Sequence, residues 1–175
     1  AENGILYKTA ESLETLKGID TAVLDKTGTV TEGKPEVTDL LPAPGVTADE
    51  LLAAAAAAER PSEHPLAAAV LRRAGAAGLD AAPMADFVTV PGQGVRGTLD
   101  GAELLAGNRR MMEAAGLAAG VFGADADALA NEGKTPLFFA RGGRPLGVIA
   151  VADVVKPTSR AAIEELAAMG ITSVM

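Results

Sequence analysis

The sequence predicts an α/β domain that is interrupted by a longer α+β domain, an antiparallel sheet flanked by helices. A strand-like run at 21–24 leads directly into Asp25. Ligands of open α/β sheets bind beyond the carboxyl ends of the strands, which is where Asp25 would lie. Between 38 and 151, short apolar strands joined by tight turns alternate with helical patterns. We therefore expect residues 1–37 and 152–175 to form the first domain and residues 38–151 to form the inserted one.

Helical and strand-like patterns alternate in the first domain. Pro157 suits the first turn of its last helix, and Gly170 suits the end of that helix. The expected elements are a strand over 4–8, a helix over 10–16, a buried strand over 21–24, a helix over 157–169 and a strand over 171–175.

Clear local signals bound the elements of the inserted domain. Thr47 with Glu50 three residues later predicts a capping box, while Asp100-Gly101 and Gly142-Gly143 predict tight hairpin turns. We place a hinge into this domain near 34–38. The expected elements are a strand over 36–41, helices over 47–60 and 63–76, strands over 87–90, 95–99 and 102–106, helices over 109–116 and 122–132, and strands over 137–141 and 146–152.

Composition narrows the function classes. The 175 residues are 49% hydrophobic, enough for a substantial core, and the net charge of -8 argues against nucleic acid or an anionic membrane surface as a partner. The absence of cysteine excludes disulfides and thiolate metal sites. No run approaches the roughly 20 apolar residues of a membrane span. We expect a monomer.

The pentapeptide Asp25-Lys26-Thr27-Gly28-Thr29 has the chemistry of a phosphoryl acceptor. A carboxylate can attack phosphorus to form an aspartyl-phosphate. Lys26 supplies positive charge, and N–H groups of a turn over Gly28 can cradle phosphate oxygens. Mg²⁺ prefers oxygen ligands and would be shared between Asp25 and the transferred group. The hydroxyls of Thr27 and Thr29 either hold phosphate oxygens or cap the turn.

The eleven residues from Asp25 to Pro35 resemble the phosphorylation loop of the P-type ATPases, and the residues that follow resemble the heavy-metal-transporting class IB branch. The resemblance implies that the first domain is part of a haloacid-dehalogenase-like phosphorylation (P) domain and that the insert is a nucleotide-binding (N) domain. It implies catalytic roles for Asp25, Lys26, Thr27 and Thr29. Asp25 and the backbone carbonyl of Thr27 would hold Mg²⁺.

Glu59-Arg60-Pro61-Ser62-Glu63-His64-Pro65-Leu66 lies at the junction of two predicted helices. We expect Ser62 to cap the second helix and His64, the single histidine, to lie in its first turn. Taken alone, such a histidine is more often a surface or capping residue than a ligand contact. Ser-Glu-His-Pro resembles the adenine-contact segment of the same family, which implies that Glu59, Ser62 and His64 bind nucleotide. Glu63 complements the helix dipole.

Gly92-Gln93-Gly94 is the third motif. With Gly97 it satisfies G-x-G-x-x-G, but a strand and a hairpin follow instead of a helix, which excludes the dinucleotide-binding interpretation. Gly92 and Gly94 either allow a nucleotide to approach the backbone closely or simply form a turn between strands. The motif alone does not separate these two possibilities.

Two further segments resemble the same family. Gly107 and Asn108 match its Gly-Asn-(Arg or Lys) segment at a strand-to-helix junction, where an asparagine can cap the helix and Arg109 could reach phosphate or ribose. Met111 and Met112 are expected to fill the core. Asp153 lies in a segment similar to the family's return hinge, so it contacts nucleotide, supports the hinge or caps the next helix.

The resemblance covers the whole chain and implies the cytosolic ATP-binding and phosphorylation region of an integral membrane transporter. The expected partners are ATP and ADP and the transmembrane and actuator domains of the same chain. Residues 1–6 and the Gly-Asn-Arg segment favour copper(I) as the transported ion, although zinc and cadmium exporters share most of these motifs. The family's Thr-Gly-Asp and Gly-Asp-Gly-x-Asn-Asp loops do not occur here, so we expect nucleotide binding with little or no ATPase activity.

Two alternatives stay open. One is a soluble haloacid-dehalogenase-type phosphatase, a class that usually carries a second aspartate two residues after the nucleophile, where this chain has Thr27. The other is a free-standing nucleotide-binding regulatory module, favoured if the natural chain stopped at Met175. The unfinished α/β half argues against it.

Overall fold

The computed structural model of the chain describes residues 6, 8–80, 82–117 and 122–175. The chain divides into two compact units, Ala1–Gly33 with Val155–Met175, and Lys34–Val154. Two strands, β2 (Thr31–Pro42) and β7 (Arg144–Val155), carry the chain from one unit into the other. The predicted domain boundaries, after residues 37 and 151, fall inside these strands and stay a prediction.

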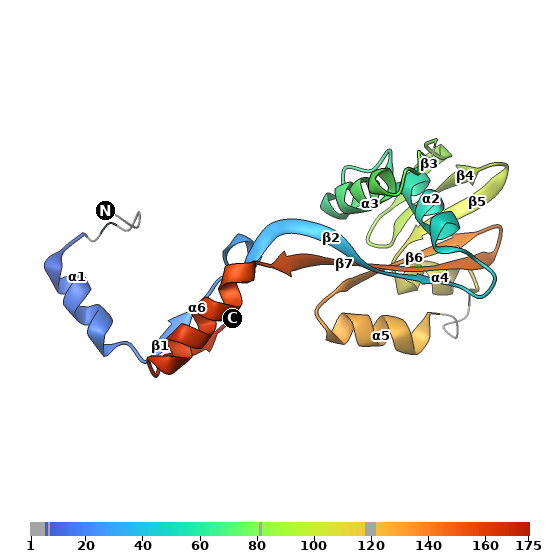
Figure 1. Ribbon diagram of the computed structural model, residues 1–175. Coiled ribbons are helices and arrows are strands. Elements are labelled where there is room, and N and C mark those ends of the chain that lie inside the picture. Colours follow the sequence, from blue (N-terminus) through green and yellow to red (C-terminus); the bar gives the residue numbers. More distant parts are fainter. Residues whose placement is uncertain (1–5, 7, 81, 118–121) are drawn as a thin grey trace. The chain divides into compact units, whose positions relative to one another are not determined.

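The smaller unit is an α/β arrangement built around two parallel strands (Figure 1). Thr21 pairs with Thr172 and Val23 with Val174, so the strands predicted near these positions are confirmed. Both expected helices are present, and Gly170 ends the second with a φ of 81°. The elements are α1 (Ala10–Thr15), η1 (Leu16–Gly18), β1 (Thr21–Val23), η2 (Lys26–Val30), α6 (Pro157–Ala168) and β8 (Thr172–Val174).

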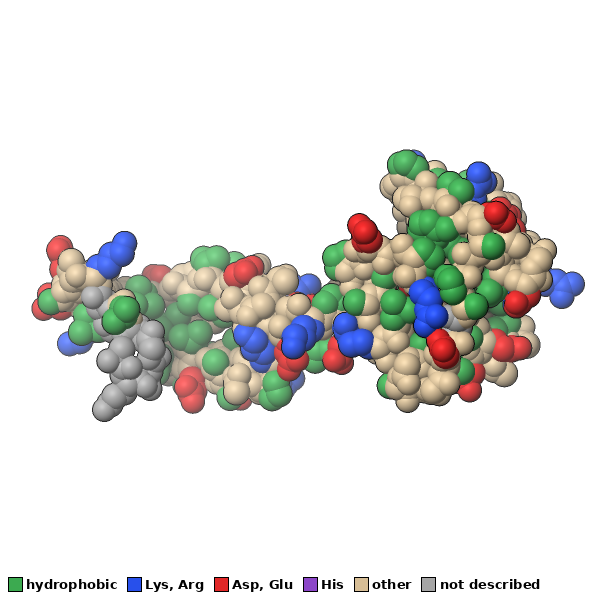
Figure 2. Space-filling view, turned by 90° about the horizontal axis from the view of Figure 1, so that it is seen from above, with side chains coloured by type: hydrophobic (Ala, Val, Ile, Leu, Met, Phe, Trp, Pro, Cys, Tyr) green, Lys and Arg blue, Asp and Glu red, His purple; other side chains and the backbone are tan. Residues whose placement is uncertain are grey.

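The predicted burial of the strand before Asp25 is wrong. Val23 is 80% exposed, and Val174 on the paired strand is also exposed. Within the described residues this sheet has two strands, too few to give either one a neighbour on both edges. Hydrophobic side chains of this unit are accordingly visible at its surface (Figure 2). Most of the strand expected over 4–8 lies outside the described residues.

The larger unit contains a six-stranded sheet in the order β2-β7-β6-β5-β4-β3. The tight turns occur where they were predicted, with positive φ at Asp100, Gly101, Gly142 and Gly143. The predicted hinge at 34–38 lies inside β2, which is continuous and longer than expected because β7 pairs along it. The other strands are β3 (Ala85–Val90), β4 (Gly94–Leu99), β5 (Ala102–Gly107) and β6 (Thr135–Arg141).

The predicted helices flank this sheet, and they cover both of its faces (Figure 1). Because side chains alternate along a strand, neighbours in sequence enter different cores. Leu104 and Phe139 pack with helices α2 (Ala48–Glu59) and α3 (Pro65–Ala76), whereas Leu105 and Phe138 pack with α4 (Arg109–Ala114) and α5 (Gly123–Asn131). The capping box of Thr47 and Glu50 opens α2 as expected. Met111 and Met112 are buried in the second core, as expected.

Candidate functional site

Asp25 lies just after β1, separated from it by Leu24, and is the N-cap of the turn η2. Gly28 has a φ of 77°, a conformation that glycine adopts without steric cost, and this reverses the chain. The predicted catalytic residues, Asp25, Lys26, Thr27 and Thr29, are all exposed on this one turn. The turn therefore presents a carboxylate, an ammonium group and two hydroxyls to an incoming ligand.

Side chains from outside the pentapeptide hold this turn in place. The Thr31 hydroxyl is 1% exposed, donates to the Lys26 carbonyl at 2.9 Å and accepts from the Gly28 N–H at 3.2 Å. The buried Ser159 hydroxyl donates to the Val30 carbonyl at 2.7 Å, and the Lys156 N–H donates to the same oxygen at 3.0 Å. Thr31 and Ser159 are therefore supports of the turn, a role that sequence reasoning missed.

Lys156 makes a further contact that was not predicted. Its Nζ donates to the Gly28 carbonyl at 2.7 Å. The sequence does place a lysine before the helix-opening Pro157, and the residue before a proline is biased toward extended backbone, which Lys156 adopts with a ψ of 141°. That local signal fixes the backbone of Lys156. It does not show which group the ammonium reaches.

The oxygen atoms of the turn suit Mg²⁺ as ligands. This cation usually keeps several waters and binds one or two carboxylates plus substrate phosphates. The Asp25 side chain makes no capping hydrogen bond to η2, so its oxygens are available. The Thr27 backbone carbonyl would be a second hard oxygen ligand. Among the described residues no group of three or more acidic or histidine side chains forms a metal cage. The turn fits an ion shared with substrate.

The second group of predicted site residues lies at the junction of α2 and α3. Glu59 ends α2 and is 8% exposed. Burial raises the pKa of its carboxyl, opposed by a hydrogen bond with Ser62 and by the charge of His64. The Ser62 N–H donates to the Glu59 carbonyl at 3.0 Å. The fold thus holds a buried carboxylate beside two polar side chains.

The expected cap of α3 is wrong. His64 is the N-cap, and its Nδ1 accepts from the Leu66 N–H at 3.2 Å, whereas Ser62 Oγ accepts from the His64 N–H at 3.2 Å. Pro65 at the first helical position disfavours helical backbone at His64, so the helix begins two residues later than expected. Because Nδ1 is the acceptor, a neutral imidazole carries its proton on Nε2, which can donate to a ligand.

The two glycine motifs pack against each other. The Asn108 side chain donates to the Gly92 carbonyl at 2.8 Å, and the Asn108 N–H donates to the Gln93 carbonyl at 2.7 Å. A Cβ at Gly94 would lie 2.2 Å from the Ala106 carbonyl oxygen, and one at Gly107 would lie 2.3 Å from the Gln93 carbonyl oxygen. Close backbone packing therefore requires both glycines.

Gly92 and Asn108 belong to the same pair of packed motifs but have different roles. Gly92 has a φ of 68° with open space where a side chain would be, so its turn leaves an approach to the backbone. The Asn108 Oδ1 accepts from the Met111 N–H at 3.2 Å, so the predicted cap of α4 is confirmed. Gly92, Gly94, Gly107 and Asn108 thus lie together, although two of them have an evident packing role.

Asp153 supports a strand pair. It lies on β7, and its Oδ1 accepts from the N–H of Lys34 on β2 at 3.1 Å. The alternative that it caps the next helix is wrong, because Lys156 is the N-cap of α6. The contact agrees with the expected support of the connecting segment.

Arg109 is held by other groups of the protein. Its guanidinium forms an ion pair with Asp127 on α5 and lies 5.9 Å from the centre of the Phe138 ring. These contacts tie α4 and α5 to the sheet, so binding a phosphate or ribose would require Arg109 to leave them.

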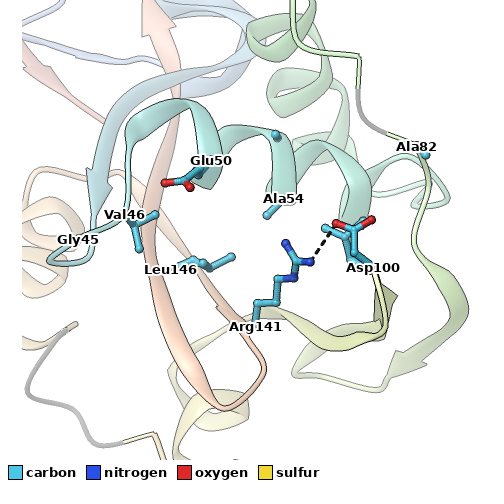
Figure 3. Close-up of a pocket in the computed structure, with 10 residues that line it drawn as sticks. Gly45, Val46, Glu50, Ala54, Ala82, Asp100, Arg141 and Leu146 are labelled. Carbon is cyan, nitrogen blue, oxygen red and sulfur yellow. Dashed lines mark hydrogen bonds and ion pairs between the residues drawn. The ribbon is translucent and has the colours of Figure 1, made fainter.

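The cavity in Figure 3 is separate from these groups. It measures about 380 Å³ and lies between α2 and the tips of two hairpins, with an ion pair of 2.9 Å between Arg141 and Asp100. Its Glu50 carboxylate already serves the α2 capping box. None of the predicted site residues lines it.

Comparison with known families decides the classification. Residues 19–175 match the family described as haloacid dehalogenase-like hydrolase. The chain belongs to this family. Within these hydrolases it is 42% identical over its full length to Copper-transporting ATPase 1 of Rhizobium meliloti (strain 1021), of which it covers 21%. The chain thus spans about a fifth of the length of the curated relatives it matches.

Solved structures agree with this family assignment. A zinc-transporting PIB-type ATPase in its E2.Pi state matches with a TM-score of 0.86 at 34% identity, over 99% of this chain and 28% of that one. The catalytic domain of the CPx-ATPase CopB-B, studied for its changes upon nucleotide binding, matches with a TM-score of 0.69 at 26% identity, over 98% of this chain and 59% of that one. The predicted resemblance to the catalytic region of heavy-metal P-type ATPases is confirmed, as is the fold class.

None of the helices in the described part of this chain has the length and apolar character needed to cross a membrane.

Proposed function

We propose that this chain is the ATP-binding and phosphorylation region of a heavy-metal-translocating P-type ATPase. The larger unit binds Mg-ATP, and Asp25 on the smaller unit receives the γ-phosphoryl group. The observation that carries the proposal is the placement of Asp25. Its exposed carboxylate lies just after β1, on a turn whose backbone is held by Thr31, Lys156 and Ser159.

The chemistry follows from that turn. An Asp25 carboxylate oxygen forms a bond to the γ-phosphorus while the bond from that phosphorus to the β,γ-bridging oxygen breaks, and the electron pair leaves with ADP. Lys26 offsets the negative charge of the reacting groups, and the hydroxyls of Thr27 and Thr29 hold phosphate oxygens. Asp25 and the Thr27 backbone carbonyl would hold Mg²⁺, which would supply positive charge to offset the negative charge of the nucleotide.

Nucleotide binding is assigned to the larger unit. The Glu59 carboxylate would accept a hydrogen bond from the adenine 6-amino group, and His64 Nε2 would donate to the base or its ring would stack on it. Ser62 holds both residues in place. The open side of the Gly92 turn, with Gly94, Gly107 and Asn108 behind it, would let the nucleotide approach the backbone. Asp153 supports the strand pair or contacts the nucleotide.

Transport is proposed from the relatives. Copper(I) is the proposed ion, because the curated relative named above is a copper-transporting ATPase. The region would lie on the cytoplasmic side of a membrane protein and work with transmembrane and actuator domains of the same polypeptide.

A haloacid-dehalogenase-type phosphatase is the second candidate, because family membership alone fits both. The residue at position 27 separates them. A carboxylic acid there would protonate the leaving group and then activate water, whereas the Thr27 hydroxyl is a poor general base. An aspartyl-phosphate on Asp25 should therefore persist.

Calorimetric titration with ATP, ADP and GTP tests the nucleotide assignment. His64→Gln and Glu59→Ala should each weaken ATP binding by about 10-fold or more, since a lost hydrogen bond to a charged group is worth about 1.5–3 kcal/mol. Glu63→Ala is the matched control, because Glu63 is exposed in the same segment and should leave binding unchanged. ATP binding that neither variant weakens would refute the roles of Glu59 and His64.

A further inference from the structure

Three carbonyl groups of the turn η2, which follows Asp25, each accept a hydrogen bond from a side chain of the protein. The Lys26 carbonyl accepts from the Thr31 hydroxyl, the Gly28 carbonyl from Lys156 Nζ and the Val30 carbonyl from the Ser159 hydroxyl, at 2.9, 2.7 and 2.7 Å. Carbonyl oxygens carry partial negative charge, so the ones that face a phosphate oppose its binding. Each of these three is directed instead at a donor of the protein.

Binding a carbonyl also orients the next N–H group. A trans peptide is planar, with its C=O and N–H pointing in opposite directions. The Gly28 oxygen points to Lys156, so the Thr29 N–H points away from Lys156. The same reasoning applies to the Lys26 oxygen and the Thr27 N–H. These are the N–H groups of the residues whose hydroxyls we assign to phosphate oxygens.

The peptide between Gly28 and Thr29 is the one that most needs such a constraint. Gly28 has a φ of 77° with open space around it, and glycine tolerates either orientation of the following peptide. Thr31 already fixes the Gly28 N–H, but that bond leaves the Gly28 carbonyl free to rotate. The Lys156 ammonium supplies the missing constraint through a charge-assisted hydrogen bond, a class roughly twice as strong as neutral ones.

We propose that Lys156 is a positioning residue for phosphoryl transfer to Asp25. Its ammonium holds the Gly28 carbonyl and thereby keeps the Thr29 N–H aimed at the transferred group, while adding one positive charge to the turn. This inference rests on the proposed function, because it requires Asp25 to form its oxygen–phosphorus bond as the bond to ADP breaks. Lys156 itself transfers no proton and does not contact the reacting atoms.

Three variants separate this role from a general effect of charge. Lys156→Met keeps the side-chain stem and removes the ammonium, and Lys156→Arg restores a cationic donor. Arg160→Met is the matched control, since Arg160 is an exposed cation one turn further along α6 with no hydrogen bond or ion pair to the described residues. Thermal unfolding of each variant verifies that it is folded.

The first measurement is the backbone order parameter of the Thr29 N–H in the 175-residue chain, from NMR relaxation. Lys156→Met should lower this order parameter from the range of rigid backbone, about 0.85, toward that of flexible backbone, below about 0.6, by releasing the peptide, while Arg160→Met should not. Lys156→Arg should stay close to wild type. An unchanged order parameter at Thr29 in Lys156→Met would overturn the proposal.

The second measurement is phosphoenzyme formation from labelled ATP in a full-length P-type ATPase that carries this region, with Asp25→Asn as the blank. Lys156→Met should slow phosphorylation about 10- to 100-fold, because misplacement of reacting groups by about 1 Å has that effect. The apparent KM for ATP should change less than about twofold, because binding lies elsewhere. Lys156→Arg should recover most of the rate.

The outcomes are distinguishable. Phosphorylation of Lys156→Met at the wild-type rate, or an equal loss in Arg160→Met, would overturn the role of Lys156 while leaving Asp25 as the acceptor. No phosphoenzyme in the unsubstituted protein, with the same background as Asp25→Asn, would overturn the proposed function and the role of Lys156 together.

Discussion

Gly94→Ala should destabilise the larger unit strongly. The new Cβ would lie 2.2 Å from the Ala106 carbonyl oxygen and 2.4 Å from the Gly107 Cα, both backbone atoms of the paired strand β5. Gly94 also has a φ of 149°, which side chains rarely adopt. Strained backbone costs about 1–3 kcal/mol and overpacking about 1–3 kcal/mol, so the expected loss is about 2–6 kcal/mol of unfolding free energy.

Two other glycines make this prediction specific. Gly92→Ala places its Cβ in open space at a φ of 68° and should cost only about 1–2 kcal/mol. Gly75→Ala lies inside α3 with open space around it and should stabilise the chain by about 0.5–1 kcal/mol. Urea unfolding followed by circular dichroism measures all three. A Gly94→Ala loss below about 1 kcal/mol, or one equal to that of Gly92→Ala, would refute the packing argument.

The same variants separate packing from ligand binding. Gly92→Ala should fold and yet bind ATP more weakly, since its Cβ would occupy the approach to the backbone. A loss of ATP binding in Gly94→Ala, by contrast, would follow from damage to the sheet. Normal ATP affinity in folded Gly92→Ala would show that the nucleotide does not approach this turn.

Two further outcomes follow from buried polar groups. Burial raises the pKa of the Glu59 carboxyl above its ordinary value of 4.5, so the native chain loses stability as pH rises from 4.5 through the raised value. Glu59→Gln should lack this pH dependence of the unfolding free energy and should be more stable than wild type near neutral pH. If the unfolding free energies of the two proteins changed in parallel with pH, the raised pKa of Glu59 would be contradicted. Thr31→Val removes a buried hydroxyl that serves two groups of the turn and should cost about 1–3 kcal/mol, whereas the exposed Thr29→Val should cost less than about 0.5 kcal/mol in the same unfolding assay.

Local signals predicted the elements well because their causes are local. The capping box at Thr47, the positive-φ turns at Asp100-Gly101 and Gly142-Gly143 and the end of α6 before Gly170 all depend on residues within a few positions of one another. The phosphorylation motif likewise located Asp25 after a strand, because the motif is contiguous.

The predicted helix caps were less accurate where two nearby residues could each fill the cap position. Ser62 and His64 are both good caps, and Pro65 decided between them by disfavouring helical backbone at the residue before it. Asp153 preceded a helix closely enough to suggest a cap, but strand β7 continues past it and its carboxylate accepts from Lys34 instead.

By itself, then, the sequence determined the order of helices and strands, the turn at Asp25 and the family. Only the tertiary structure decided what surrounds them. The exposure of Val23 depends on how many strands flank it, and the packing of Gly94 on Gly107 depends on strand pairing. Lys156 and Gly28 are 128 positions apart, and no local sequence pattern predicts a hydrogen bond over that separation. Such contacts arise from the path of the folded chain, because packing brings together groups that the sequence keeps far apart.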